Sequence, residues 1–187
     1  MNNLKVIFAQ EPKEERIAKR MARSGLCSRR DAERWILAKR VMVDGIIIDT
    51  PALKVNSKSV IIVDGKVIPE KEEPRLWRYH KPTGQITTTR DVRGRITVFD
   101  ILPKDMPRVV SVGRLDYESE GLLLLTNDGE LARQLELPST AWVRRYRVRV
   151  YGRPQQKHLD RLSKGVTIDG IKYGTIDIKL DLSHIHI

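Results

Sequence analysis

The spacing of hydrophobic residues from residue 14 to residue 40 is helical and predicts two short helices. Ser24-Gly25 is expected to end the first helix, because Gly tolerates the left-handed conformation that follows a helix C-terminus. Ser28, with Asp31 three positions later, has the Ser-x-x-acid form of an N-terminal cap and starts the second helix. The apolar stripes that should face a core are Ile17, Ala18 and Met21 in the first helix and Ala32, Trp35 and Ile36 in the second.

Two apolar runs that are each interrupted by Asp-Gly follow the helices. They read "VMVDGIII" and "VIIVDGKVI". Asp-Gly between apolar runs favours a type I′ turn, so each run predicts a β-hairpin. We therefore expect a compact α+β domain over residues 14–68. Residues 69–75, with two prolines and a run of charges, are typical of a linker.

The pattern after Leu76 predicts a second domain, over residues 76–187, with a mixed or antiparallel sheet. Four consecutive leucines in "GLLLLTND" predict a strand buried on both faces. "DGELARQLEL" predicts a helix capped by Asp128, and "PQQKHLDRLSKG" a helix that ends at Gly165. "RRYRVRVYG" and "TIDIKLDL" alternate as strands do, the former with a cationic face, and "VTIDGIKYG" predicts a further hairpin. The fold class expected for the chain is α+β.

Charge narrows the range of partners. The 187 residues carry 35 Lys and Arg against 24 Asp and Glu, a net charge of +11. Such an excess favours a polyanion, with nucleic acid preferred over a membrane surface. No apolar run approaches the roughly 18–20 residues that span a bilayer, and no signal peptide opens the chain. The single cysteine, Cys27, excludes an internal disulfide and a Cys-based zinc site. A soluble, cytoplasmic, monomeric protein is the expectation.

The region of the two predicted helices carries more than half of the net positive charge. Between residues 13 and 40 there are ten basic and four acidic residues. A solvated surface is the ordinary explanation for such a run. Basic side chains on both sides of one turn can also converge on a phosphate backbone, to which Arg binds with two parallel hydrogen bonds.

The stretch "RIAKRMARSGLCSRRDAERWILAKRVMVDGIII" resembles an S4 RNA-binding domain, in which two helices and an adjoining hairpin grip structured RNA. The resemblance covers about residues 14–60. It implies RNA contacts from the start and the exposed side of the second helix. The candidates for RNA binding in this domain are Lys19, Arg20, Arg23, Ser28, Arg29, Arg30, Arg34 and Lys39.

A second candidate site is the stretch "VGRLDYESEGLLLLTNDGE". Asp116 precedes the leucine strand, where we expect a rigidly placed carboxylate that is partly shielded from water. Such a group can act as a nucleophile or a general base. From the triplet alone, a structural role explains it better: a salt bridge between Arg114 and Asp116 that closes a turn, or Asp116 capping backbone N–H groups. No Walker loop, Ser-His-Asp set or metal-ligand cluster lies nearby in the sequence.

Three ordered motifs, "HKPTG", "VGRLDYESEGLLLLTNDGELA" and "RRYRVRV", resemble those of the pseudouridine synthases, most closely the bacterial group that modifies rRNA and carries an S4 domain. The resemblance covers about residues 14–183. It implies that Asp116 is the catalytic residue and that Tyr146 lies against a flipped-out uracil. Whether Asp116 attacks the ribose or the base is left open. It also implies that Arg114 fills the gap in the RNA and that no cofactor or metal is needed. Lys81 is a further candidate for a phosphate contact.

The resemblance also implies a late Gly-x-x-x-Gln-[Ile/Val]-Arg-Arg motif, which this sequence lacks, so the synthase domain is expected to be incomplete at its C-terminus. We expect isomerisation of uridine in a structured rRNA stem-loop, with large-subunit rRNA preferred over small-subunit rRNA. The alternative is an S4-type rRNA-binding protein in ribosome assembly with an impaired synthase domain. His184 and His186 share a strand face, but two imidazoles alone rarely form a metal site.

Overall fold

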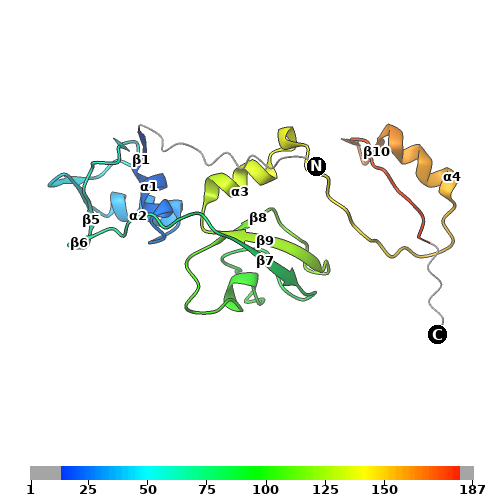
Figure 1. Ribbon diagram of the computed structural model, residues 1–187, viewed down its shortest axis with the longest axis horizontal. Coiled ribbons are helices and arrows are strands. Elements are labelled where there is room, and N and C mark those ends of the chain that lie inside the picture. Colours follow the sequence, from blue (N-terminus) through cyan, green and yellow to red (C-terminus); the bar gives the residue numbers. More distant parts are fainter. Residues whose placement is uncertain (1–13, 182–187) are drawn as a thin grey trace. The chain divides into compact units, whose positions relative to one another are not determined.

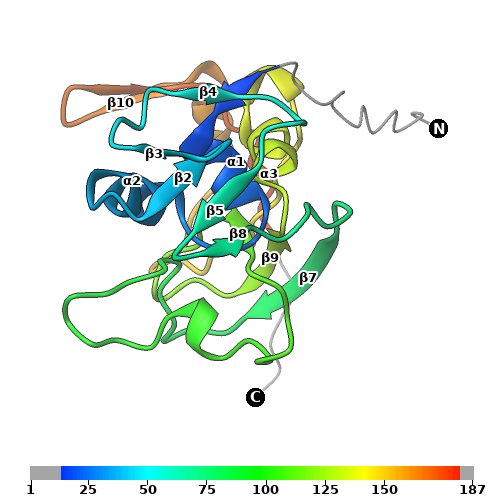
Figure 2. The same ribbon diagram turned by 90° about the vertical axis from the view of Figure 1, so that its left-hand side faces the viewer.

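The computed structural model describes residues 14–181, and the chain forms two compact units, the first ending at Trp142 and the second beginning at Val143. Figure 1 shows the elements of both units. The first unit opens with two helices and a sheet, and these pack together in Figure 2. Its elements up to the linker are β1 (Glu15–Arg16), α1 (Ile17–Arg23), α2 (Arg29–Leu37), β2 (Val41–Val43), β3 (Ile46–Ile48), β4 (Lys54–Val55), β5 (Ile61–Val63) and β6 (Lys66–Val67).

The two predicted helices are present, with boundaries close to those expected. Gly25 follows α1 with φ +78°, and Ser28 caps α2 through a full capping box with Asp31. One correction concerns Glu15 and Arg16, which the periodicity placed in the helix. They form β1, antiparallel to β4, because the backbone there pairs with a segment about 40 residues later in the sequence. Periodicity within the helix cannot indicate that partner.

Both Asp-Gly hairpins form as predicted. Asp44 and Gly45, and likewise Asp64 and Gly65, have positive φ at both central positions, as a type I′ turn requires. The strands assemble in the order β3-β2-β5-β6. The predicted apolar stripes pack against this sheet: Ile17, Met21, Ala32 and Ile36 are fully buried together with its valines. This core holds α1 and α2 in a fixed relation.

Residues 69–75 have no regular structure, and a three-stranded antiparallel sheet follows in the order β7-β9-β8. Helix α3 crosses one face of it (Figure 1), and Asp128 caps that helix as expected. The elements are β7 (Leu76–Lys81), the 3-10 turn η1 (Val98–Asp100), β8 (Val110–Val112), β9 (Gly121–Thr126), α3 (Gly129–Glu136) and the 3-10 turn η2 (Pro138–Thr140).

The leucine strand is the middle strand, β9, but the prediction that both of its faces are buried is wrong. Leu123 and Leu125 are buried in the core of this sheet, whereas Leu122 is 65% exposed. Successive side chains of a strand point to opposite faces. In the first unit, the face that carries Leu122 is left open at that end of the strand.

The second unit contains α4 (Gln156–Leu159), the 3-10 turn η3 (Asp160–Lys164) and the hairpin of β10 (Val166–Ile168) and β11 (Ile171–Tyr173). The helix that ends at Gly165 and the Asp-Gly hairpin were predicted. The strands expected over residues 144–151 and 175–181 are not formed in the described part of the chain. Alternation fits a strand, but a strand also needs a neighbouring strand for its ladder of hydrogen bonds, and within residues 14–181 neither segment pairs with one. The backbone of Ile176, Ile178 and Leu180 bonds instead to the carbonyl of Leu162 and to the side chain of Gln156.

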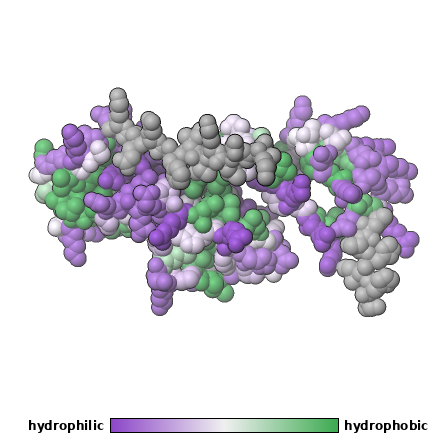
Figure 3. All heavy atoms as spheres, in the orientation of Figure 1, coloured by the Kyte–Doolittle hydropathy of each residue, from purple (hydrophilic) through white to green (hydrophobic). Residues whose placement is uncertain are grey.

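None of the helices in the part of the chain that the structure describes is both long and apolar enough to cross a membrane. Hydrophobic side chains gather on the surface of the first unit, at the left end of Figure 3 over β3, β5 and β6. Ile46, Ile47 and Val67 are exposed there.

Candidate active site

Asp116 lies in the connection between β8 and β9, residues 113–120, which we name the aspartate loop. The loop begins at Gly113, whose positive φ of +72° turns the chain out of β8. The N–H of Ser119 donates to the carbonyl of Asp116 at 3.1 Å and closes a turn. The Asp116 side chain is exposed, not partly shielded as we expected, because this turn separates it from the buried part of β9. The carboxylate therefore stands at the surface on a fixed backbone.

Lys81, the last residue of β7, holds this backbone from beneath. The residue is 0% exposed, and its ammonium donates to the carbonyls of Ser119 at 2.7 Å and Asp116 at 2.9 Å. It also donates to the carbonyls of Pro82 and Tyr117. Burial lowers the pKa of Lys81, and the charges of Asp116 and Glu118 oppose that shift. The expectation that Lys81 contacts phosphate is corrected: its donors face carbonyls inside the protein.

The last residue of the "HKPTG" motif, Gly84, and Thr87 beyond it add two more anchors. The Thr87 hydroxyl donates to the carbonyl of Leu115 at 2.9 Å, and the N–H of Leu115 donates to the same hydroxyl at 3.3 Å. The N–H of Gly84 donates to the carbonyl of Tyr117 at 2.9 Å. The carbonyls on both sides of Asp116, and its own, are thus held by groups from residues 81–87. Sequence reasoning missed Thr87. It is one of three consecutive threonines, and nothing in the sequence indicates which of them bonds to Leu115.

An arginine also lies close to the aspartate loop. The guanidinium carbon of Arg95 is 6.0 Å from the centre of the Tyr117 ring, within the range of a cation–π contact. Arg95 in turn forms a salt bridge with Asp91. Neither residue was among the candidates from the sequence. The Asp-x-x-Gly-Arg spacing is a turn signal that would have indicated an Asp side chain bound to its own loop.

The predicted RNA contacts of the S4-like region divide into two groups. Four are already engaged inside the protein: Lys19 with Glu15 and Glu130, Arg23 with Glu15, Arg34 with Asp31, and the hydroxyl of Ser28 within its capping box. Lys19 and Arg23 are corrected from RNA contacts to structural ion pairs, because their side chains are largely buried beside these carboxylates. Arg34 remains 70% exposed and retains donors for phosphate.

The second group is accessible. Arg29, Arg30 and Lys39 are exposed and Arg20 is half-buried, and none of them forms a salt bridge with another residue in the described range 14–181. Arg29 and Arg30 open α2, where unpaired backbone N–H groups also favour an anion. Arg114, in the aspartate loop, is exposed as well.

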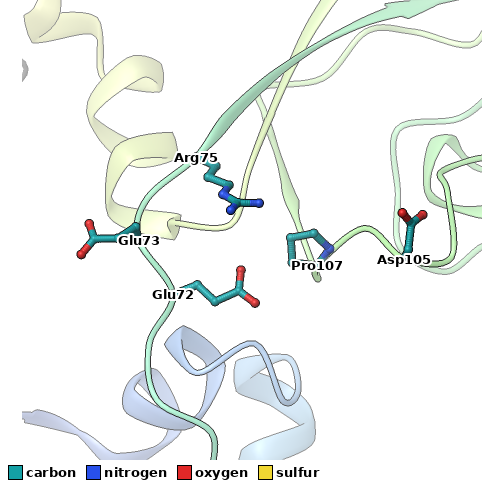
Figure 4. Close-up of a pocket in the computed structure, with 5 residues that line it drawn as sticks. All are labelled: Glu72, Glu73, Arg75, Asp105 and Pro107. Atoms are coloured by element: carbon teal, nitrogen blue, oxygen red, sulfur yellow. The ribbon is translucent and has the colours of Figure 1, made fainter.

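The remaining candidates lie elsewhere. Tyr146 belongs to the second unit and is 69% exposed. His184 and His186 fall outside the described residues. Within residues 14–181 no group of three His, Cys, Asp or Glu side chains could hold a metal ion. A hollow of about 380 Å³ lies beside the linker, and none of its lining residues belongs to the aspartate loop. Glu72, Arg75 and Pro107 are among the residues that bound it (Figure 4).

A basic two-helix module precedes an antiparallel sheet that presents exposed carboxylates, Asp116 among them, on an internally fixed loop. This combination fits an enzyme that acts on a polyanion. The model of the RNA pseudouridylate synthase family matches residues 75–182, and that of the S4 domain matches residues 15–61. The chain belongs to the RNA pseudouridylate synthase family and carries an S4 domain, as the resemblance in the sequence indicated.

Curated relatives agree with the family assignment. An "uncharacterized RNA pseudouridine synthase" of Rickettsia felis is 51% identical over 166 residues, which are 89% of this chain and 72% of the relative. "Ribosomal large subunit pseudouridine synthase B" of Haemophilus influenzae is 43% identical over 161 residues, 83% of this chain and 45% of that protein. A crystal structure of a pseudouridylate synthase matches 86% of this chain and 70% of its own, with a TM-score of 0.52 and 20% identity, which shows a shared fold.

Proposed function

We propose that this protein converts a uridine of ribosomal RNA into pseudouridine, with the large-subunit rRNA as substrate and Asp116 as the catalytic residue. The reaction breaks the bond between C1′ of the ribose and N1 of the uracil, and joins C1′ to C5 of the same base. C5 loses its proton and N1 gains one, so the product is an isomer and no oxidant or reductant is needed.

One observation carries the assignment of Asp116. Its carboxylate is exposed, while its carbonyl accepts from Lys81 and Ser119 and Thr87 holds the backbone of the preceding residue, Leu115. A fixed reacting group removes the entropic cost of orientation from the chemical step. A base inside an RNA helix is inaccessible, so the uridine must be flipped out to reach a carboxylate on a protein surface. Tyr146 against the uracil and Arg114 in the vacated stack complete the proposal.

The preference for large-subunit rRNA rests on relatives. The proteins of Haemophilus influenzae, Pasteurella multocida and Pseudomonas aeruginosa that match this chain at 42–43% identity are named for the large ribosomal subunit. The accessible cations Arg20, Arg29, Arg30 and Lys39 fit a phosphate backbone, and folded rRNA is recognised through shape and unpaired loops. Such a substrate places the protein in the cytoplasm.

The test is a deletion of the gene in its host, followed by mapping of pseudouridine in both ribosomal subunits. Loss of one large-subunit pseudouridine is expected, with recovery by the unaltered gene and no recovery by a gene carrying Asp116→Asn. Asp116→Asn keeps the side-chain volume and leaves the backbone contacts of Lys81 in place. Unchanged pseudouridine in the deletion strain would overturn the proposal and favour a protein that binds rRNA in ribosome assembly.

A further inference from the structure

Residues 90–95, "RDVRGR", form a surface loop that the proposed reaction does not use, and we name it the arginine loop. Three of its six residues are arginines and one is an acid. Arg90 and Arg93 are exposed and form no salt bridge within residues 14–181. A loop with two unpaired cations near the candidate active site requires an explanation beyond solubility.

The arginine loop is internally ordered by Asp91. Its carboxylate accepts hydrogen bonds from the N–H groups of Arg93 and Arg95, at 3.2 and 2.9 Å. It also accepts from Nε and Nη2 of Arg95, at 3.1 and 2.8 Å. Gly94, with φ +69°, makes the reversal that brings these donors together. The loop therefore has a defined shape before any ligand arrives, which lowers the entropic cost of binding.

The end of the arginine loop at Arg95 lies against the aspartate loop. The Arg95 guanidinium faces the ring of Tyr117, the residue after Asp116. The chain beyond it is tied to residue 86 by backbone hydrogen bonds from Ile86 to Ile96 and from Val98 to Ile86, each of 3.0 Å. Arg95 keeps donors that Asp91 does not use, since a guanidinium has five. A phosphate beside Asp116 would find them already in place.

The other end of the loop faces helix α2. Arg90 lines a groove of about 950 Å³ between α2 and residues 89–109. The groove is lined by five cationic side chains and three acidic ones, Asp31, Glu33 and Asp100, so its net charge is about +2. The cationic side chains are Arg30, Arg34, Arg90, Lys104 and Arg108. The arginine loop thus joins the cationic side of α2 to the surroundings of Asp116.

The tip of the arginine loop is apolar. Val92 is 95% exposed between the arginines. An apolar side chain at that place gains nothing from contact with water. Proteins that open nucleic acid helices use apolar side chains as wedges against bases, with cations on the adjacent phosphates. The order Arg90, Val92, Arg93 has that composition.

We propose that the arginine loop is an RNA-binding element that carries the substrate strand from the α2 groove to the aspartate loop. Arg90 and Arg93 bind phosphates, Arg95 binds the phosphate next to the target nucleotide, and Val92 packs against a base. The proposal rests on the proposed function, since it assigns part of the same rRNA to this loop. It also explains why Asp91 orders the loop so completely.

The position of the loop on RNA is tested by cleavage from a tethered iron chelate. The chelate is attached through Val92→Cys, through Glu33→Cys in the groove, and through Lys58→Cys outside it. Cys27 does not compete for the reagent, because it is buried and burial raises its pKa to about 11. The probe is large-subunit rRNA from the host, with the unsubstituted protein as a blank.

The Val92→Cys and Glu33→Cys proteins are expected to cut the same stem-loop, with the cuts from Val92→Cys nearer to the uridine that is modified in cells. Lys58→Cys should cut it weakly or not at all. Cuts from Glu33→Cys without cuts from Val92→Cys would overturn the assignment of the arginine loop while the proposed function stands. Failure of all these proteins to retain the rRNA on a filter would overturn both.

A second measurement addresses the charges. Arg90→Ala with Arg93→Ala should reduce the slope of log affinity against log salt by about 1.4–1.8, since each phosphate contact contributes about 0.7–0.9. The matched control, Lys58→Ala with Lys66→Ala, removes the same charge from exposed positions outside the groove and should leave the slope nearly unchanged. Equal slopes for the two double variants would mean that the arginine loop makes no phosphate contact.

Discussion

At the scale of single residues, the most informative side chain is Lys81. Its positive charge suggested a phosphate contact, but its ammonium binds carbonyls inside the protein. A buried ammonium is costly unless it is hydrogen-bonded, and here backbone carbonyls of the aspartate loop supply the bonds. The same contacts fix the position and direction of the aspartate loop relative to β7. Lys81 is therefore a positioning residue for Asp116 and not a ligand for RNA.

Lys81→Met should preserve packing while leaving the carbonyls of Pro82 and Ser119 without their donor. Each unsatisfied carbonyl costs about 1–3 kcal/mol, so we expect a loss of about 3 kcal/mol in the free energy of unfolding, measured by urea denaturation. Lys66→Met, at an exposed position, is the control and should change stability by less than about 0.5 kcal/mol. Equal midpoints for the two variants would show that the Lys81 contacts contribute nothing.

Cys27 lies in the connection between α1 and α2, and the reactivity of its thiol tests whether this side chain is buried in solution. Desolvation raises the pKa of Cys27 to about 11 from 9.0. A raised thiol pKa means that the reactive thiolate forms only at higher pH, so at pH 8 the thiolate fraction should be about a hundredfold lower than for an unshifted thiol. The rate of alkylation by iodoacetamide against pH measures this. A rate that levels off near pH 9 would contradict the burial of Cys27.

At the scale of elements, the caps decide where helices begin. Asp128 accepts hydrogen bonds from the N–H groups of Glu130 and Leu131 and forms a salt bridge with Lys71. Burial acts to raise the pKa of Asp128, but these backbone donors and Lys71 together lower it. Helix α3 therefore starts at a residue that also ties the linker to the sheet.

Asp128→Ala should destabilise the protein by about 1 kcal/mol, the usual cost of a lost N-terminal cap. Because the folded pKa is lowered, the carboxylate stabilises the fold above the unfolded pKa of about 3.9, and this contribution is lost as pH falls through the folded pKa. Urea titrations of the two proteins at pH 7 and pH 3 measure it, and the difference should shrink at pH 3. Asp128→Asn keeps an oxygen acceptor and should lose less at pH 7; a loss equal to that of Asp128→Ala would argue against the cap.

At the scale of the whole molecule, the boundary between the two units falls inside the region matched by the synthase family. Residues 141–150 have no regular structure and are exposed, and this segment contains Arg144, Arg145, Arg147 and Arg149. A backbone without regular hydrogen bonds and with accessible arginines is a preferred site of proteolysis.

Limited digestion with trypsin should therefore cut first within residues 144–153 and leave a resistant fragment that contains all three sheets of the first unit. Mass spectrometry of the early products identifies the site. Addition of large-subunit rRNA should slow this cut if Tyr146 and its neighbours face the substrate, as proposed, whereas polyglutamate of equal mass should not. A first cut in the linker, residues 69–75, would contradict this order.

The pattern of residues determined the α+β class, the two helices, the Asp-Gly hairpins and the presence of the leucine strand. These features depend on neighbours a few positions away, through side-chain period and turn conformation, so the sequence contains them directly. The motif around Asp116 also indicated the family that the comparisons confirmed.

Only the tertiary structure decided the features that depend on contacts between residues distant in the sequence. β1 replaced the start of a helix because Glu15 and Arg16 pair with β4. Leu122 is 65% exposed because the face of β9 that carries it is largely uncovered at that end of the strand. Lys19, Arg23 and Lys81 have the same charge as the accessible cations, yet carboxylates or carbonyls distant in sequence engage them. Charge is a local property of a residue, whereas access to a ligand depends on which groups the fold brings beside it.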